Sequence, residues 1–304
     1  IVQSAACTFG LRSVQEGAVF GAKVAQAAGC TDADPAAAAA CLRRQPVQAL
    51  IAAADQAAGD DLMAFAPVYG QRTLARPGLQ GLPAGQFVRV PVLYGGTRDE
   101  LRLWVGYAAQ AGQPMTQANY PELLRAVYGE HAAAVQVRYP APAQGSAAAT
   151  LGSVTSDFRP DNGINHCQFV DTAQLLARHV PVYFMEFADR QAPVLGVSMP
   201  AQPDPGFELG AVHSAELNYF FPHFSNTTRI DAPDLLPASQ ALSQQLVATW
   251  ASFVRTGAPQ ALGLPAWQRF NEKAKPCALR QGKSPLLLRA VPINAIFGAA
   301  CTRR

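Results

Sequence analysis

The chain of 304 residues has few charged residues and very little lysine. Only 15% of its residues are Asp, Glu, Lys or Arg, and lysine occurs four times. The 24 Lys and Arg residues nearly balance the 21 Asp and Glu residues, which leaves a net charge of +3. A nucleic-acid-binding protein needs a clustered basic face, so this balance argues against that class. Hydrophobic residues make up 49% of the chain, which is enough for a sizeable core.

Long apolar runs and metal-binding spacings are also missing. No run reaches the ~18–20 residues that a membrane span requires. The six cysteines include no C-x-x-C and no paired Cys/His spacing, so a structural zinc site is not expected. An even number of widely spaced cysteines instead favours disulfides and an oxidising compartment. Because scarce lysine and abundant alanine are typical of a GC-rich bacterial genome, we expect a secreted or periplasmic bacterial protein.

The first residues, Ile1-Val-Gln-Ser4, show neither an initiator Met nor the features of a signal peptide. A β-branched pair that runs into polar residues is typical of the end of a strand. We therefore expect Ile1 to lie inside a longer polypeptide.

Helical segments alternate with two apolar, β-branched segments that are typical of strands. Strands are expected at 88–94, ending at a Gly-Gly loop, and at 180–187. Helices are expected at 13–29, 34–44, 46–56, 119–128, 147–157, 162–178 and 233–256. The Gly- and Pro-rich stretch 65–87 predicts an excursion or lid. This order predicts an α/β fold with a mostly parallel sheet, helices on both faces, and catalytic residues on loops beyond the strand ends.

Two loops hold candidate catalytic residues. Asp99-Glu100 directly follows the first predicted strand, where a carboxylate is well placed to orient a catalytic imidazole. The alternative is a polar turn with solvated carboxylates. His213 follows a long Gly- and Pro-rich loop, and it is either a catalytic base or a structural histidine.

Cysteine spacing suggests two disulfides. Cys30 and Cys41 flank a predicted helix, and a bridge between them would contribute roughly 3 kcal/mol by closing a short loop. The alternative is two separate buried thiols. Cys277 and Cys301 are the next predicted pair, on spacing alone.

Together these features resemble the type-B carboxylesterase family of α/β-hydrolases, which includes the cholinesterases and bacterial esterases. The resemblance is co-linear over essentially the whole chain, through Ile1-Val-Gln-Ser4, Cys30…Cys41-Leu-Arg, Phe65-Ala-Pro-Val68, Gly85-x-Phe87, Val90…Asp99-Glu100, Ser156-Asp157-Phe158, Cys167, Gly210-x-x-His213-x-x-Glu216-Leu and Trp250…Trp267. It implies an α/β-hydrolase fold, with residues 1–304 forming the C-terminal part of a single domain. It also implies a Ser–Glu–His triad in which Glu100 is the acid and His213 is the base, without a cofactor or metal.

The nucleophile of that triad is missing from the sequence. No G-x-S-x-G elbow occurs in the 304 residues. The resemblance therefore implies that an N-terminal portion of the same enzyme supplies the serine and the oxyanion hole, and that the substrate is a small ester. The alternative is a non-catalytic, cholinesterase-like binding or adhesion domain that has lost its nucleophile.

The resemblance also assigns roles to residues around the two loops. It places Ser4 close to the acid, which Ser4 would help to fix, whereas the alternative is a hydroxyl that only satisfies the end of a strand. Glu216 is expected to be a structural buried acid. Leu101 stands where the family usually has Gly, and Leu103 and Trp104 are candidates for the acyl pocket, unless they pack the helix that follows.

The late disulfide has two possible pairings. The family would join Cys167 to a C-terminal cysteine, so Cys167–Cys301 is the alternative to Cys277–Cys301.

Overall fold

A computed structural model describes residues 1–5, 10–59, 61, 63–142, 145–161, 163–194, 204–222, 224 and 234–270. The chain divides into two compact units. Ile1–Cys7 with Leu82–Arg304 form one, here called the sheet unit, and Thr8–Gly81 form the other, here called the helical unit. Glu100 and His213 belong to the sheet unit.

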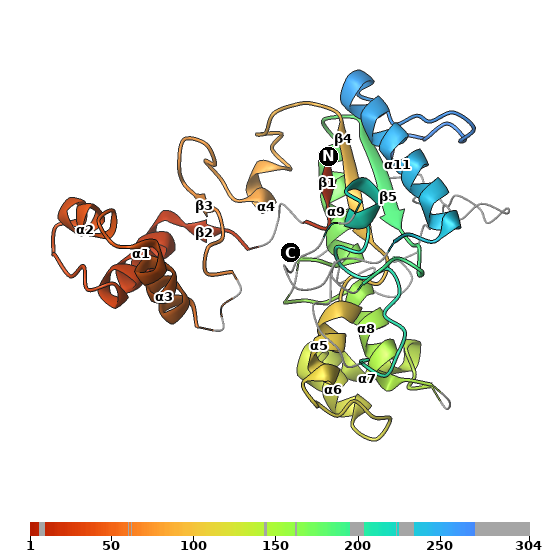
Figure 1. The fold of residues 1–304 in the computed structure, drawn as a ribbon, viewed down its shortest axis with the longest axis horizontal. Coiled ribbons are helices and arrows are strands. Elements are labelled where there is room, and N and C mark those ends of the chain that lie inside the picture. Colours follow the sequence, from red (N-terminus) through yellow and green to blue (C-terminus); the bar gives the residue numbers. More distant parts are fainter. Residues whose placement is uncertain are drawn as a thin grey trace. The chain divides into compact units, whose positions relative to one another are not determined.

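Among its described residues, the sheet unit has three parallel strands (Figure 1). They are β1 (Val2–Gln3), β4 (Val92–Thr97) and β5 (Val182–Phe187), in the order β1-β4-β5. In the register of the central strand, Val2 pairs with Tyr94, and Gly96 pairs with Glu186. Because all three strands are parallel, their C-terminal ends meet at one edge, where the candidate residues lie.

Helices cover both faces of this sheet. Leu93 and Met185 pack with Trp250 of α11 (Pro237–Thr256), whereas Tyr94 packs with Phe169 of α9 (His166–Ala177). This alternation follows from the two-residue period of a strand, and each fully buried apolar side chain contributes about 1.5–3 kcal/mol. The expectation of a parallel sheet with helices on both faces is confirmed.

A further group of helices packs around the segment that follows the acid. These helices are α5 (Arg102–Gln110), α6 (Tyr120–Tyr128), the 3₁₀ turn η1 (Gly129–His131), α7 (Ala132–Arg138) and α8 (Ala147–Asp157). Their shared core contains Leu124, Leu151 and Val154. The short α10 (Leu217–Phe220) follows the histidine loop and packs on α11.

The described residues of the helical unit form three longer helices and one small parallel ladder. Its elements are β2 (Arg12–Ser13), α1 (Val14–Ala27), α2 (Pro35–Leu42), α3 (Val47–Ala58), β3 (Val68–Tyr69), which pairs with β2, and α4 (Gly78–Gly81). Ser13 and Glu16 form the capping box that the sequence predicts for the first helix. Asp34 caps α2 by accepting two backbone hydrogen bonds.

The predicted Cys30–Cys41 bridge is confirmed, with 5.6 Å between the two Cα atoms. Cys167 is disulfide-bonded as well. Cys277 and Cys301 lie outside the described residues, so the two predicted late pairings, Cys277–Cys301 and Cys167–Cys301, remain alternatives.

The predicted strand at 88–94 is wrong at both ends, because β4 begins at Val92 and continues through Gly95 and Gly96 to Thr97. The strand needs glycine at these two positions because a larger side chain would not fit. A Cβ on Gly95 would lie 1.9 Å from the backbone oxygen of Met185, and a Cβ on Gly96 would lie 2.3 Å from the Phe169 ring.

Candidate active site

Glu100 lies in the turn that follows β4, and its side chain is fully buried. One carboxylate oxygen, Oε1, accepts hydrogen bonds from the Thr97 backbone N–H at 2.7 Å and from the Ser4 hydroxyl at 2.5 Å. The other oxygen, Oε2, lies 2.9 Å from Nδ1 of His213. A buried carboxylate must be hydrogen-bonded or paired, and this one is held at both oxygens.

Ser4 reaches the carboxylate from the end of β1. Its backbone N–H donates to the Gly95 carbonyl at 2.8 Å, and its backbone is in the left-handed region at φ 51°. This conformation costs a non-glycine residue free energy, and it turns the hydroxyl toward Glu100. The structure therefore places Ser4 against the acid, as the resemblance implies.

The loop with Glu100 and the loop with His213 are joined by their backbones. The Asp99 N–H donates to the Ala211 carbonyl at 2.8 Å, and Oδ2 of Asp99 accepts the Ala211 N–H at 3.0 Å. The His213 N–H donates to the Glu100 carbonyl at 3.3 Å. Asp99 therefore ties the two loops together but does not face the imidazole.

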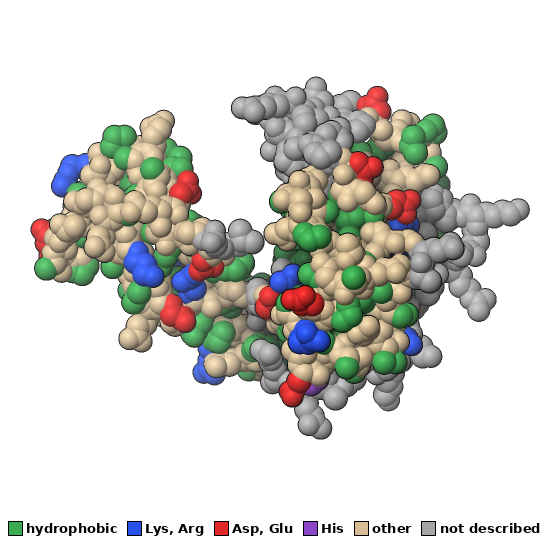
Figure 2. Space-filling model, turned by 90° about the horizontal axis from the view of Figure 1, so that it is seen from below, with side chains coloured by type: hydrophobic (Ala, Val, Ile, Leu, Met, Phe, Trp, Pro, Cys, Tyr) green, Lys and Arg blue, Asp and Glu red, His purple; other side chains and the backbone are tan. Residues whose placement is uncertain are grey.

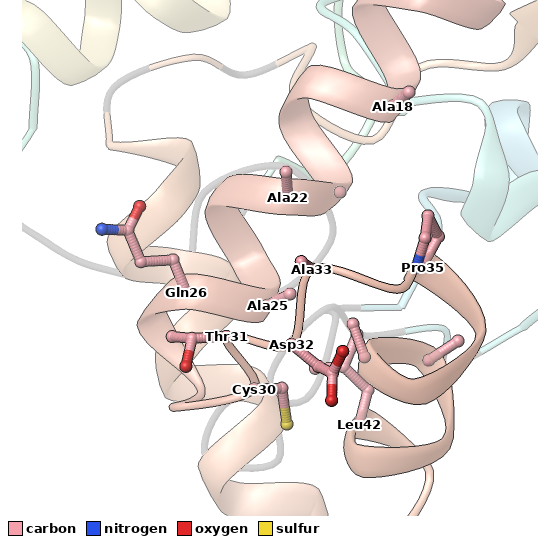
Figure 3. A pocket seen from close by; sticks show the side chains of 13 residues that line it. Ala18, Ala22, Ala25, Gln26, Cys30, Thr31, Asp32, Ala33, Pro35 and Leu42 are labelled. Atoms are coloured by element: carbon pink, nitrogen blue, oxygen red, sulfur yellow. The ribbon is translucent and has the colours of Figure 1, made fainter.

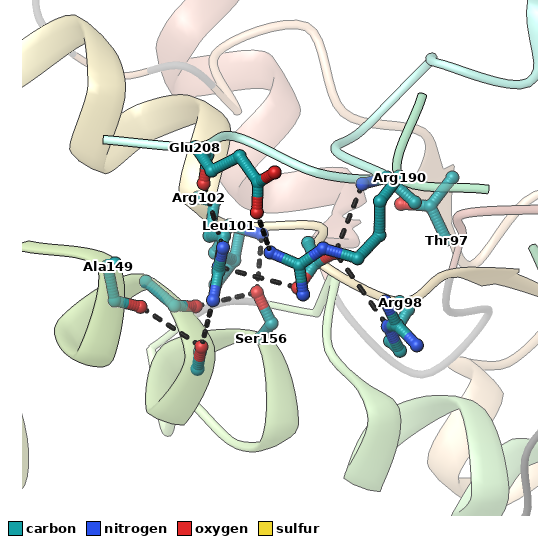
Figure 4. A network of polar contacts seen from close by, with 12 residues as sticks. Thr97, Arg98, Leu101, Arg102, Ala149, Ser156, Arg190 and Glu208 are labelled. Atoms are coloured by element: carbon teal, nitrogen blue, oxygen red, sulfur yellow. Dashed lines mark hydrogen bonds and ion pairs between the residues drawn. The ribbon is translucent and has the colours of Figure 1, made fainter. Parts of the chain in front are cut away.

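A network around Arg102 anchors the acid turn to α8 (Figure 4). Arg102 donates to the Glu208 carbonyl at 2.8 Å and to the Ser153 hydroxyl at 2.7 Å, and its Nε lies 3.4 Å from Asp99. The Leu101 N–H donates to the Ser156 hydroxyl at 2.9 Å. Leu101 itself is buried, so the residue that stands in place of the usual glycine adds to the core.

His213 is positioned so that one ring nitrogen faces the acid. Its side chain is 27% exposed, and the Trp104 ring lies beside it with 5.3 Å between ring centroids. Since Nδ1 faces a carboxylate, Nδ1 is the protonated nitrogen of the neutral ring, and Nε2 is the basic one. Trp104 is partly buried, whereas Leu103 is 5% exposed and packs in the sheet core.

Two buried acids act on the pKa of His213. Burial alone lowers that pKa, but the hydrogen bond and charge of Glu100, together with the charge of Glu216, raise it above its ordinary value. Glu216 is itself buried and accepts a hydrogen bond from Gln3 at 3.1 Å. Burial and the nearby Glu100 raise the pKa of Glu216 to about 7.

We also looked among the described residues for a basic surface, a metal site and a membrane-spanning helix. On the face drawn in Figure 2, Lys and Arg side chains are scattered among Asp and Glu side chains. In the described part of the chain, no group of three or more His, Cys, Asp or Glu residues could hold a metal ion. Among these residues there is also no helix long and apolar enough to cross a membrane.

An open pocket of about 660 Å³ lies within the helical unit, between α1 and α2 (Figure 3). Alanines make up much of its wall, and its polar side chains are Gln26, Thr31 and Asp32. The cysteine in its wall, Cys30, is held in a disulfide. The lining of this pocket therefore contains no histidine and no free thiol.

The parallel sheet with helices on both faces is consistent with an α/β-hydrolase fold, which the following family match implies. The chain belongs to the carboxylesterase family, which matches residues 1–285. It is also similar to Carboxylesterase 3 of Pongo abelii, at 33% identity over 95 residues. That match covers 30% of this chain and only 16% of the relative. Since the relative is an orangutan protein, the comparisons do not support the bacterial origin suggested by composition.

Proposed function

We propose that the complete protein hydrolyses carboxylic esters with a Ser–His–Glu triad, and that this chain supplies the acid and the base. The observation that supports this proposal is the 2.9 Å contact between Nδ1 of His213 and Oε2 of the fully buried Glu100. A binding domain without catalysis has no need for a partly exposed imidazole that is oriented by a buried carboxylate. We therefore favour an enzyme over a cholinesterase-like adhesion domain.

The mechanism follows from the orientation of the ring. Nε2 of His213 takes the proton of the serine hydroxyl as its oxygen attacks the ester carbonyl, and then gives that proton to the leaving alcohol. Glu100 keeps Nδ1 protonated and stabilises the imidazolium that forms in between. Water then attacks the acyl-enzyme, with His213 taking a proton from the water and giving it to the serine oxygen, and the carboxylic acid product is released. No cofactor or metal takes part in these steps.

The nucleophile and the oxyanion hole are assigned to an N-terminal portion of the same protein. No G-x-S-x-G occurs in the sequence. In the described sheet, β1 pairs with β4 on one side only, and a strand with an open edge is a ready template for another strand. We assign that edge to strands of the N-terminal portion.

The substrate is proposed to be a small ester with an apolar group beside Trp104. The indole lies against the imidazole and so borders the place where the ester carbonyl must sit. Leu103 supports this wall from the core. The bonded cysteines Cys30, Cys41 and Cys167 support an oxidising compartment, and we assign the protein to secretion or the periplasm.

The complete enzyme, with its N-terminal portion, is the material for the test. His213→Ala should lower kcat for p-nitrophenyl acetate by about 10⁴ or more and abolish labelling by a fluorophosphonate probe, because nothing else deprotonates the serine. The control is His131→Ala, since the His131 side chain is 78% exposed and its Nε2 lies 3.9 Å from the exposed carboxylate of Glu130. An unchanged rate in His213→Ala, or no esterase activity in the unmodified enzyme, would contradict the proposal.

A further inference from the structure

A second histidine faces a second carboxylate behind the acid turn. His166 is the first residue of α9, and Glu186 lies near the end of β5. Nδ1 of His166 lies 3.3 Å from Oε2 of Glu186, and Nε2 lies 3.0 Å from the Thr97 carbonyl oxygen. Both side chains are buried, and the proposed hydrolysis uses neither of them.

The contacts of the His166 ring fix where its protons lie. A carbonyl oxygen only accepts hydrogen bonds, so Nε2 must carry a hydrogen and donate it to Thr97. Nδ1 then either carries a second proton that faces ionised Glu186, or accepts a proton from neutral Glu186. In both cases the pair shares one proton and has no net charge.

Electrostatics favour keeping this shared proton. Burial lowers the pKa of His166, but the charge of Glu186 and the Thr97 carbonyl raise it above its ordinary value overall. Burial raises the pKa of Glu186, although His166 partly opposes this. The other charged groups that act on the pair are Asp157, Glu100, Arg98 and Asp99.

Thr97 connects this pair to the acid. Its N–H donates to Oε1 of Glu100 at 2.7 Å, and its carbonyl is held by His166. The residue is therefore fixed at both ends, and a backbone with only two soft dihedrals has little freedom left. The residue before it, Gly96, pairs in register with Glu186. The His166–Glu186 pair and the turn that holds Glu100 therefore lie at the same end of the sheet.

We propose that His166 and Glu186 are positioning residues for Glu100: the pair holds the Thr97 carbonyl, and the Thr97 N–H therefore stays aimed at the catalytic carboxylate. This inference rests on the proposed esterase function. The pair acts through the backbone and touches neither the substrate nor the reacting atoms.

The test compares two variants of the complete enzyme. Glu186→Gln keeps a donor for Nδ1 of a neutral His166, so kcat should stay within about threefold of the unmodified enzyme. The double variant His166→Phe/Glu186→Gln loses the donor to Thr97 without leaving a buried charge. Its kcat should fall about tenfold or more while KM changes little, because the acid is misplaced in the transition state.

The pH profile separates positioning from a loss of stability. Glu100 raises the pKa of His213, so an acid that is less well held should move the acid limb of kcat/KM to lower pH. The matched control is Tyr128→Phe, since the buried Tyr128 also donates to a backbone carbonyl, that of Phe158 at 2.7 Å, away from the acid turn. It should lower the melting temperature and leave the acid limb in place.

The proton positions can be read in the unmodified enzyme without any substitution. In ¹⁵N-histidine-labelled enzyme, Nε2 of His166 should remain protonated from about pH 6 to pH 9. A bare Nε2, or an active double variant with unchanged kcat and acid limb, would overturn the clamp while leaving the triad intact. An inactive unmodified enzyme would instead overturn the proposed function, and the ¹⁵N signals would still decide the proton positions.

Discussion

The sheet unit contains two histidine–glutamate pairs with opposite surroundings. In each pair, Nδ1 of the imidazole faces Oε2 of the glutamate, at 2.9 Å for His213–Glu100 and 3.3 Å for His166–Glu186. The His213 ring is partly exposed, whereas the His166 ring is buried with its Nε2 held by a carbonyl. An imidazole whose second nitrogen is bonded to backbone has no basic nitrogen for a substrate. Exposure of the ring, more than the pair itself, distinguishes the proposed catalytic base His213 from the buried His166.

The two glutamates also differ in the number of hydrogen bonds that their carboxylate oxygens accept. Both oxygens of Glu100 have partners, and its Oε1 accepts two hydrogen bonds. Oε1 of Glu186 has no hydrogen-bond partner among the described atoms. Hydrogen bonds therefore hold both oxygens of Glu100 in place, whereas burial raises the pKa of Glu186 and favours a shared proton in its pair with His166.

Gly96→Ala should disturb both pairs at once, and its effect should exceed that of any substitution that disturbs one pair from outside its histidine and glutamate. A Cβ there would lie 2.5 Å from Oε1 of Glu100 and 2.3 Å from Phe169 of α9, the helix that begins with His166. We expect kcat to fall by about 100-fold or more, together with a loss of stability of about 1–3 kcal/mol from overpacking. Steady-state kinetics and thermal unfolding of the complete enzyme measure these effects, and near-normal kcat would show that the turn tolerates movement.

Ser4→Ala should affect the His213–Glu100 pair but not the His166–Glu186 pair. It removes a hydrogen bond to a buried carboxylate, and we expect kcat to fall about tenfold and stability to fall by about 1–3 kcal/mol. The matched control is Ser239→Ala, because the buried Ser239 hydroxyl donates to the carboxylate of Asp189 at 2.7 Å, away from the acid turn. It should lower stability with kcat unchanged, and equal kcat losses in both variants would assign Ser4 to stability only.

Glu216→Gln should give the smallest change and sharpen the electrostatic side of the comparison. The charge of Glu216 raises the pKa of His213, so the acid limb of kcat/KM should move slightly to lower pH when that charge is removed. A shift to higher pH would contradict this reasoning.

The same substitution should change how stability depends on pH. The pKa of Glu216 is raised from 4.5 to about 7 in the folded protein. The unfolded chain therefore loses this proton first as pH rises, and stability falls between about pH 4.5 and 7, by up to about 3 kcal/mol. Glu216→Gln should remove that fall, as urea unfolding across this pH range would show.

The sequence predicts the His213–Glu100 pair but not the His166–Glu186 pair. Glu100, His213 and Ser4 stand in motifs whose order and spacing can be read along the chain, and the structure brings all three together. His166 and Glu186 have no such local pattern. They meet only because α9 packs on the sheet behind the acid turn, which is a tertiary contact.

The ends of β4 and the positions of Leu103 and Trp104 are harder to predict, because both depend on tertiary packing. Gly95 and Gly96 are typical of a loop, but here they allow β4 to approach Met185 and Phe169 closely. Leu103 and Trp104 are adjacent in sequence, yet Leu103 packs in the sheet core whereas Trp104 lies beside His213. Which of two neighbouring residues on a helix faces a site depends on how the helix packs.

The most direct test of the central claim compares two neighbouring carboxylates in the complete enzyme. Glu100→Gln should lower kcat for a simple aryl ester by about 10⁴, because an amide cannot stabilise the imidazolium; the size is taken from the analogous change in a serine protease. Asp99→Asn keeps an oxygen for the Ala211 N–H and should cost less than about tenfold in kcat. If Asp99→Asn were the crippling change and Glu100→Gln were tolerated, the assignment of Glu100 as the acid of the triad would be contradicted.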